Sequence, residues 1–578
     1  MGIAPSAVAR GTGVTTNFKD LSGGAVRFVP QRIAIIAQGE DGLSYPTDKF
    51  TIDGGAAQVG GILGYRSQAY QIARELFPVN GQNVGTTIVD VIPLAQPAGG
   101  AAAAGGVDVA SGTATETATY TPVLGGVPGQ GVLVQKGTID TDVVLSDVTD
   151  SINNTLGMPA QAVNTYGAPA GNDSANITLS AISVTGAPKG GAYSIVCSDA
   201  GSQLFNVYDP KGNLRAKDEA VGAKSIDGLD FTIAAGSATL GETATIDVLV
   251  TDVVLNVAWD GAHGNDVQLE MQGPLTLGVT WTLTPFTGGA GVADVDPALT
   301  EIGDVWNTMI ITPESAEANL DKFVIWGEAR WGELVHKPAI VFYGNNDASV
   351  GDATFGTQDR GSDRVTCQLV NPGSNNMPWV IAAAQVNPIV RLAQVNPPHD
   401  YGSQPAFSLN PGPDSVQWDY NLRDLAIKQG SSTVEVKDGV VNVSDVVTPW
   451  SPTGEEPPAY RYVVDQIKLM QVIYNLDLAF NNAEWDGAPL IPEGPTTNTE
   501  AKTPKMAIAV VAAIVENLAL EAIISDAATA IASITANINP SNPKRLDISV
   551  TVQVSGNTNI KDVTLNWGFF FGSAPVVG

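Results

Sequence analysis

The C-terminal end of the chain alternates apolar and polar residues in two runs, and this pattern constrains the fold more than any other. The first run reads LDISVTVQV from residue 546, and the second reads VTLNWGFFF to residue 571. Strict alternation predicts β-strands, because successive side chains of a strand point to opposite faces. The intervening SGNTNIKD contains glycine and asparagine, which favour a hairpin turn. The apolar positions are Leu546, Ile548, Val550, Val552 and Val554, then Val563, Leu565, Trp567, Phe569 and Phe571.

An isolated two-stranded hairpin is only marginally stable in water. A hairpin at this end of the chain must therefore dock either on its own chain or on another subunit. The two alternating runs can pair with each other, or they can flank strands that other chains supply to a shared sheet.

Composition narrows the choice of partner. A chain of 578 residues predicts two to four domains. Only 15% of the residues are charged, which is low for a soluble monomer and suggests that neighbours cover much of the surface. The formal net charge is −30, which argues against nucleic acid as a partner, because phosphate binding needs a basic surface.

Both ends of the chain are mildly basic on this acidic background. Residues 1–39 contain four basic residues and one acidic residue, and residues 540–578 contain three basic and two acidic residues. This distribution of charge favours chain ends that bind the acidic bodies of neighbouring subunits. With so few charges, chance is an equal alternative.

The chain offers little chemistry for catalysis. Its two cysteines, Cys197 and Cys367, form no disulfide framework or metal motif and fit a reducing cytosol. Its three histidines, His263, His336 and His399, are not spaced as paired ligands. No apolar stretch is long enough to predict membrane insertion. We therefore expect a protein that is not an enzyme and has no cofactor.

Two acidic pairs are the remaining candidates for a cation. Asp140 and Asp142 form one pair, and Asp294 and Asp296 form the other. Carboxylates are suitable Ca²⁺ ligands, but two of them make an incomplete site. Solvated loop acids are the favoured interpretation, and we predict no metal.

The first hundred residues predict the start of an α/β domain. Residues 32–39 and 86–94 read as buried strands, and residues 67–77 read as a helix that Ser67 caps and Pro78 ends. Residues 96–106 read as a low-complexity linker. The short alternating runs that follow to about residue 250, among them DTDVVLSDV, predict a β-sandwich or barrel inserted in the α/β domain.

The α/β pattern resumes near residue 300, so the fold class is a multi-domain α/β (α+β) protein. A hairpin is predicted at 432–446 around Asp438-Gly439. The helix at 503–526 is apolar nearly all round, which predicts burial on several sides. The other predicted strands are 304–313, 337–344 and 363–370, and the other helices are 316–332, 378–395, 421–430 and 462–480.

Several segments, taken in order, resemble the tail sheath proteins of contractile-tailed phages, in particular the Mu-like branch. SGGAVRFVPQRIAIIAQGEDG resembles the opening of these proteins, and VGGILGYRSQAYQIARELF matches the next segment. HGNDVQLEM and TPFTGGAGVADVDPALTEIGDVWNTMIITPES resemble the stretch that closes their inserted domain, and the part from NLRDLAIKQGSSTVEV onward fits the core. The likeness covers both flanks and thins across 107–250.

This resemblance implies a mechanical function. Sheath subunits form stacked hexameric rings around a tail tube, and their terminal arms add strands to the sheets of adjacent subunits. Contraction, triggered at the baseplate, drives the tube through the host envelope. Related sheaths occur in R-type bacteriocins and type VI secretion systems. The expected partners are further copies of the chain, the tube, the baseplate and the tail terminator, in a virion tail assembled in the host cytoplasm.

The resemblance also implies a division of the chain. The expected parts are an N-terminal linking arm (1–25), a sheath domain in two pieces (26–106 and 261–415), an inserted β-sandwich-like outer domain (107–260), a tube-facing inner domain (416–545) and a C-terminal linking arm (546–578). We expect strand addition by the C-terminal arm to use Ile548, Val550, Val552, Val554, Val563, Leu565, Trp567 and Phe569.

Two alternatives remain open at this stage. The β-rich region 107–250 could be the binding module of a surface adhesin instead of a decoration on a sheath. In the inner domain, Lys502 and Lys505 are candidate contacts to the tube, and the alternative is a plain core helix with solvated lysines.

Overall fold

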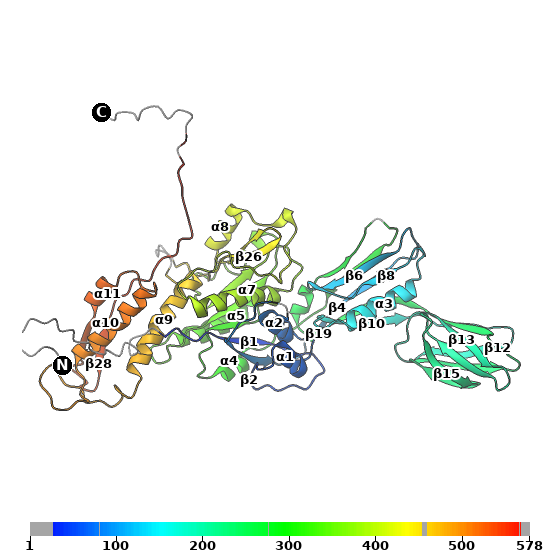
Figure 1. Cartoon of the computed structure of the whole chain (residues 1–578), viewed down its shortest axis with the longest axis horizontal. Coiled ribbons are helices and arrows are strands. Elements are labelled where there is room, and N and C mark those ends of the chain that lie inside the picture. The colour runs from blue at the N-terminus through cyan, green and yellow to red at the C-terminus, as the bar shows by residue number, and fades with distance from the viewer. Residues whose placement is uncertain (1–26, 80, 276, 453–458, 566, 568–578) are drawn as a thin grey trace, which may run out of the picture. The chain divides into compact units, whose positions relative to one another are not determined.

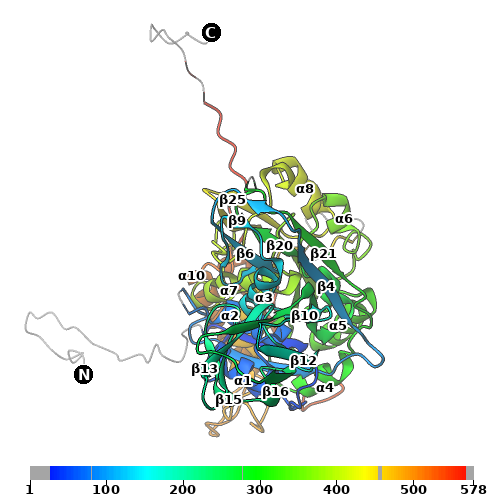
Figure 2. The ribbon, with the colours of Figure 1, turned by 90° about the vertical axis from the view of Figure 1, so that its right-hand side faces the viewer.

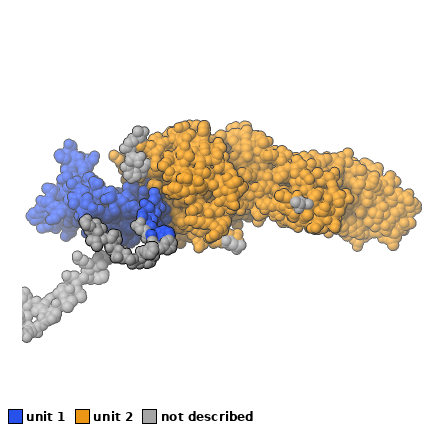
Figure 3. Space-filling model, turned by 90° about the horizontal axis from the view of Figure 1, so that it is seen from above, with its two compact units in different colours: residues 1–30, 393–400, 464–578 blue, residues 31–392, 401–463 orange. Residues whose placement is uncertain are grey.

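The computed structural model describes residues 27–79, 81–275, 277–452, 459–565 and 567, and Figure 1 shows the ribbon. The chain forms two compact units, coloured separately in Figure 3. The central unit comprises residues 31–392 and 401–463. The terminal unit comprises residues 1–30, 393–400 and 464–578, so it is built from both ends of the chain.

The central unit contains a six-stranded sheet in the order β2-β3-β1-β22-β23-β24. All neighbouring pairs are parallel except β2 with β3. The predicted strands of the α/β domain are thus confirmed. The short edge strand β2 was not predicted, and the bounds of the six strands are β1 Arg32–Gln38, β2 Phe50–Thr51, β3 Ile88–Leu94, β22 Met309–Ile311, β23 Ile340–Asn345 and β24 Thr366–Val370.

Helices cover both faces of this sheet, which is why its strands are mostly buried and mostly apolar. Ala34 and Ile36 of β1 belong to the same buried cluster as Leu299 and Phe323, which come from α4 and α5. The alternate residues of β1 point to the opposite face, and α2 packs against this strand. The helix bounds are α1 Ala56–Leu63, α2 Gln68–Leu76, α4 Asp296–Ile302, α5 Glu317–Arg330, α6 Val350–Thr354 and α7 Pro378–Val395.

A buried carboxylate joins the strand ends on one edge of this sheet. Asp90 of β3 accepts two hydrogen bonds from the guanidinium of Arg32, at 2.7 and 2.9 Å. It also accepts from Thr51 at 2.8 Å and from Asn307 at 2.9 Å. Burial alone would raise the pKa of Asp90, but these hydrogen bonds outweigh it and hold the pKa below its ordinary value.

The linker predicted at residues 96–106 is wrong for residues 102–106, because these lie in strand β4 (Ala102–Val109). This strand is central in a four-stranded sheet of order β10-β19-β4-β21. A Cβ atom at Gly105 would lie 2.9 Å from the carbonyl oxygen of Thr284 on β21, so the small residues allow a close approach. The partners are β10 Ala160–Tyr166, β19 Val250–Asp260 and β21 Trp281–Thr287.

The run DTDVVLSDV does not form a strand. It begins helix α3 (Thr141–Asn153), whose N-cap Asp140 accepts a hydrogen bond from the Val143 amide at 3.2 Å. The apolar side chains Val144, Val148 and Ile152 recur at helical spacing and are buried. Figure 2 shows α3 beside the strands of the inserted region. The other strands here are β5 Thr113–Ala114, β6 Ala118–Leu124, β7 Val127–Pro128, β8 Val132–Val134, β9 Gly137–Thr138 and β20 Leu269–Gln272.

The predicted β-sandwich is present beyond α3. One sheet has the order β11-β18-β13-β14-β15 and the other β12-β17-β16. Their shared core contains Tyr193, Phe205 and Phe231, all nearly inaccessible. The strands are β11 Ala170–Asn172, β12 Ile177–Val184, β13 Gly191–Asp199, β14 Leu204–Tyr208, β15 Leu214–Ala220, β16 Gly222–Ile226, β17 Leu229–Ala235 and β18 Thr243–Val248.

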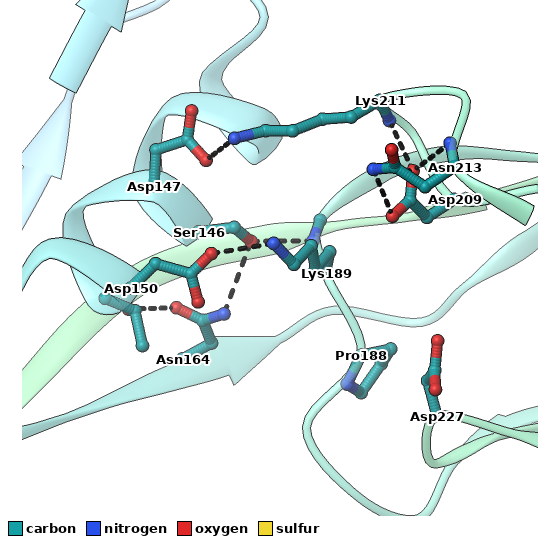
Figure 4. A network of polar contacts seen from close by, with 12 residues as sticks. Ser146, Asp147, Asp150, Asn164, Pro188, Lys189, Asp209, Lys211, Asn213 and Asp227 are labelled. Atoms are coloured by element: carbon teal, nitrogen blue, oxygen red, sulfur yellow. Dashed lines mark hydrogen bonds and ion pairs between the residues drawn. The ribbon is translucent and has the colours of Figure 1, made fainter. Parts of the chain in front are cut away.

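Polar contacts tie this sandwich to α3 (Figure 4). Lys189 donates to the carboxylate of Asp150 at 2.8 Å, and Lys211 pairs with Asp147. The hydroxyl of Ser146 accepts from the Gly190 amide at 2.6 Å. The two lysines are partly exposed, so salt screens these pairs and each contributes about 1 kcal/mol or less.

Two local predictions in the remainder of the central unit are confirmed. Helix α8 spans Tyr420–Lys428 and is capped by Asp419. Strands β25 (Thr433–Lys437) and β26 (Val440–Asp445) form the predicted hairpin. Asp438 and Gly439 at its turn have φ angles of 51° and 76°, as a type I′ turn requires.

Candidate functional site

The C-terminal part of the terminal unit contains the apolar runs that the sequence singled out. Helices α9 (Val463–Phe480) and α10 (Pro504–Leu520) are followed by α11 (Ala527–Ser533). Thr503 caps α10 by accepting a hydrogen bond from the Met506 amide at 3.3 Å. The core of this unit includes Val511, Val515 and Leu518 from α10 and Val472 from α9.

Helix α10 is less enclosed than its sequence predicted. Its buried residues Ala507, Val511, Val515 and Leu518 form one stripe. On other sides of the helix, the side chains of Met506 and Leu520 are 47% and 83% exposed. The prediction of burial on several sides is wrong for the chain alone, because the described residues supply a packing layer to one side only.

Among the described residues the two terminal runs do not pair with each other, so the hairpin alternative finds no support there. The first run supplies β28 (Leu546–Ser549), which pairs antiparallel with β27 (Thr535–Ile538). The register joins Ala536 to Ile548 and Ile538 to Leu546. Within the described residues neither strand has a second ladder partner. Alternation predicts a strand but does not specify which segment pairs with it.

The first run packs on its own chain. Ile548, Val550 and Val552 are partly buried against the core of the terminal unit, and Val554 forms an antiparallel bridge with Ile524. The alternate residues Ser549, Thr551 and Gln553 are exposed. The alternation thus separates a buried from an exposed face as predicted. Addition of these residues to a neighbour's sheet stays a prediction.

The second run exposes its apolar side chains. No strand is assigned to the described residues from 555 onward, and the exposed fractions are 82% for Ile560, 83% for Val563, 79% for Leu565 and 73% for Trp567. Phe569 and Phe571 lie outside the described residues. Three large apolar side chains at alternate positions therefore face solvent, which is unusual for a monomeric soluble protein. We call the described residues 558–565 and 567 the exposed arm.

The two candidate tube contacts differ in their surroundings. The side chain of Lys502 is buried, its ammonium donates to Glu484 at 2.5 Å, and it lies 5.4 Å from the centre of the Trp485 ring. Lys505 is exposed at the start of α10. The geometry leaves Lys505 accessible to a partner and engages Lys502 within its own chain.

The two acidic pairs considered as cation ligands are bound by groups of the chain. Lys322 lies 2.7 Å from a carboxylate oxygen of Asp294 and 2.9 Å from one of Asp296. Asp140 caps α3, and Asp142 accepts from the Val250 amide at 2.7 Å. Among the described residues, no group of three or more His, Cys, Asp or Glu side chains is placed to hold a metal ion.

One histidine is deeply buried in an ion pair. His263 lies in the 3₁₀ turn η2 (Ala262–Asp266), and its Nε2 is 3.4 Å from an oxygen of the fully buried Glu314. Its Nδ1 is 3.7 Å from Asp266. Burial alone would lower the pKa of His263, but the two carboxylates outweigh it and raise the pKa to about 10. We call this contact the His263–Glu314 pair, and it joins the end of the inserted region to the loop after β22.

Other reactive groups are separated or inert. His399 lies in an exposed loop with its Nδ1 2.6 Å from the carbonyl oxygen of Asp400. Both cysteines are buried, and burial raises the pKa of the Cys367 thiol to about 12. No helix among the described residues has the length and hydropathy needed to cross a membrane.

A cavity of about 260 Å³ lies between α2 and α7 of the central unit. Glu75, Asn387, Arg391 and Phe407 are among its lining residues, which include no histidine or cysteine. Burial raises the pKa of Glu75, against the opposing charge of Arg74. The lining includes the hydroxyl of Ser408 beside the carboxylate of Glu75, and it contains no histidine or lysine.

Comparison with known proteins bears on the fold. No family model matches this sequence, and no curated protein matches it. Two solved structures are similar over most of the chain. The sheath tail protein of Desulfitobacterium hafniense is 13% identical with a TM-score of 0.39, and the alignment covers 94% of this chain and 100% of that one. The sheath tail protein of Listeria innocua is 11% identical with a TM-score of 0.41, and the alignment covers 93% and 94%.

Proposed function

We propose that this protein is the structural subunit of a contractile phage tail sheath. It polymerises as stacked hexameric rings around a tail tube, in a virion tail assembled in the host cytoplasm. Contraction, released at the baseplate, drives the tube through the host envelope. The tube, the baseplate and the tail terminator are its other partners. A sheath of a phage-tail-like bacteriocin or of a secretion system would use the same contacts.

The exposed arm is the observation that carries this proposal. Val563, Leu565 and Trp567 alternate in sequence as strand residues do, and each is more than 70% exposed. Such residues are expected to be covered by another molecule. The sequence segments that resemble sheath proteins lie on both flanks of the chain and make a further copy of this chain the favoured partner.

The same chain offers a sheet that can receive the arm. Strands β27 and β28 form a two-stranded sheet whose outer edges are unpaired within the described residues. Free strand edges bind extended segments through backbone hydrogen bonds. A contact of the arm of one subunit with this sheet in the next is heterologous. Heterologous contacts that do not close produce helical polymers.

The free energies expected for side-chain burial and backbone hydrogen bonds in this contact are large enough for a strong, reversible linkage. Burial of each large apolar side chain contributes roughly 1.5–3 kcal/mol. Each net backbone hydrogen bond adds about 0.5–1.5 kcal/mol. Three side chains and a short ladder therefore hold two subunits together while their bodies rotate.

Substitutions in the arm test strand addition directly. Leu565→Asp places a charge on the apolar face of the arm, and we expect loss of long hollow tubes in electron micrographs of the purified protein. Thr564→Asp is the matched control, because its side chain points to the opposite face of a strand. Both residues are exposed in the free chain, so both variants should remain folded and soluble.

The control variant separates strand addition from general charge repulsion. Equal loss of tubes with Thr564→Asp and Leu565→Asp would refute strand addition and indicate general charge repulsion. Wild-type protein that forms only monodisperse particles and binds glycans would refute the sheath function in favour of an adhesin. Deletion of residues 558–578 should leave a soluble monomer, because the first run stays docked through Ile548 and Val550.

A further inference from the structure

Helix α9 contains a buried stripe of polar side chains. Lys468 and Gln471 have no exposed surface, and Asn475 is 7% exposed. Their spacing of three and four residues places them along one side of the helix. Buried polar groups are costly unless they are hydrogen-bonded, so the partners of this stripe indicate what it is for.

Lys468 binds the C-terminal segment just before the exposed arm. Its ammonium donates to the carbonyl oxygen of Ser555 at 2.6 Å and to the side-chain oxygen of Asn557 at 2.6 Å. It also donates to the carboxylate of Asp465, one turn earlier on α9, at 3.0 Å. The buried ammonium thus binds Ser555 and Asn557 through charge-assisted hydrogen bonds, which are stronger than neutral ones.

Backbone contacts end at the same place. The Ser525 amide donates to the carbonyl oxygen of Gln553 at 2.9 Å, and the Ser555 amide donates to that of Ile523 at 3.0 Å. The side chain of Asn557 donates to the carbonyl oxygen of Pro398 at 2.8 Å. Ile560, three residues later, is 82% exposed. The Lys468 site therefore fixes the root of the exposed arm.

The other two residues of the stripe hold the N-terminal segment. Asn475 accepts from the Arg27 amide at 3.2 Å and donates to the Arg27 carbonyl oxygen at 3.1 Å. Gln471 accepts from the Val29 amide at 2.8 Å. Phe28 packs against the core of the terminal unit. These side-chain amides bind the backbone of residues 27–29 as a neighbouring strand would. The residues that precede Arg27 are those predicted to form the N-terminal linking arm.

We propose that α9 is the common anchor of both chain ends and the path by which tension passes through a subunit. From Lys468 to Asn475 the helix covers about 10 Å at 1.5 Å per residue. Tension applied at one end reaches the other across this short stretch and does not pass through the sheets of the central unit. The proposal deepens the sheath function on which it rests, because in a sheath the two arms would be held by different neighbours.

Stretching single full-length molecules by tags on both termini tests the path. We expect the first rupture to be a short step, roughly 4 nm when residues 546–557 detach, because an extended chain spans about 3.5 Å per residue. In Lys468→Met, which removes the ammonium but keeps most of the aliphatic stem, this step should occur at lower force. The matched control is Lys544→Met, an exposed lysine in the loop between β27 and β28.

Two results would refute the proposal that α9 anchors both chain ends. One is a first step on the order of 100 nm in the wild type, which is the length released when the central unit unfolds first. The other is a rupture force in Lys468→Met equal to that of the wild type. Hydrogen exchange provides a check that does not depend on force. Loss of these charge-assisted bonds should speed exchange at residues 553–557 by about ten- to a hundred-fold, with the core of α10 unchanged.

The measurement separates this proposal from the sheath function. It is made on single molecules and needs no polymer. Wild-type protein that forms no tubes would refute the function and leave the anchor result standing. Wild-type protein that forms tubes, with Lys468→Met showing unchanged rupture force and exchange, would refute the anchor alone.

Discussion

Replacement of His263 by alanine would leave the carboxylate of Glu314 buried without its cation. Glu314 has no exposed surface, and its carboxylate then keeps a hydrogen bond from the side-chain amide of Asn319 at 2.7 Å. Breaking a buried ion pair by removing one partner typically costs about 3–5 kcal/mol. We expect a loss of that size in the free energy of opening around the pair. Glu314→Gln should cost less, because His263 can then release its proton.

The effect has a defined pH dependence. The pKa of His263 is raised from its ordinary 6.5 to about 10 in the folded protein. A raised pKa stabilises the fold fully below the ordinary value and loses that stabilisation as the pH rises through the folded value. The wild-type free energy of opening should therefore fall between about pH 6.5 and pH 10. Variants that lack His263 should not show this slope.

Native-state hydrogen exchange in increasing urea measures this quantity at the two segments concerned. Peptides that span residues 262–266 and 309–315 report the opening of η2 and of the loop after β22. His399→Ala is the matched control, because His399 lies in an exposed loop and such substitutions usually change stability by less than about 0.5 kcal/mol. A His263→Ala effect no larger than that of the control would refute the reasoning.

Three further predictions concern other parts of the chain. Asp90→Asn should lower the free energy of unfolding by about 1.5–3 kcal/mol, because the partly exposed guanidinium of Arg32 loses its counter-ion. Since the pKa of Asp90 is lowered, the wild type should lose stability as the pH falls through that value, and acid titrations of the two proteins should converge. Gly344→Ala places its Cβ against the carbonyl oxygen of Pro378, far inside van der Waals contact, and should cost at least about 3 kcal/mol, seen as a lower thermal midpoint or loss of soluble protein. Lys505→Glu should weaken binding to the tail tube in co-sedimentation and leave the monomer's stability unchanged, whereas unchanged binding would favour the solvated alternative.

Sequence signals that act within a few residues predicted structure well. Ser67 was expected to cap α2, and its hydroxyl accepts from the Tyr70 amide at 3.1 Å. The Asp438-Gly439 pair was expected to turn a hairpin, and both residues have the required positive φ angles. Capping and turn chemistry depend on neighbours in sequence, so no knowledge of distant partners is needed.

Predictions that depended on distant partners were less successful. The alanines and glycines of β4 read as a linker, because the sequence does not reveal that two strands flank them closely. The missed helix α3 did carry a signal, since Val144, Val148 and Ile152 recur every four residues after a capping aspartate. In this region Thr and Val favour strands by propensity, and packing overrides that preference.

The alternating apolar residues of the candidate site could be predicted from the sequence, but the segments with which they pair could not. The alternation of the C-terminal runs was clear, and the exposure of Val563 and Leu565 could not be known until the partner of β28 was found. The function of the polar stripe on α9 could not be predicted from the sequence for the same reason. Its residues are ordinary for a helix surface until the segments that cover them are known.

The hydrogen bond between Arg27 and Asn475 joins residues 448 positions apart. A ribosome adds about 5–20 residues per second, so roughly 20–90 s pass between synthesis of the two partners. Until α9 has emerged, residues 27–29 lack the side chains that later hold them, and β28 is made last of all the described strands. The terminal unit therefore completes only after the central unit has already been made. A nascent chain from which residues 535–567 have not yet emerged thus lacks the sheet and the arm through which copies would join.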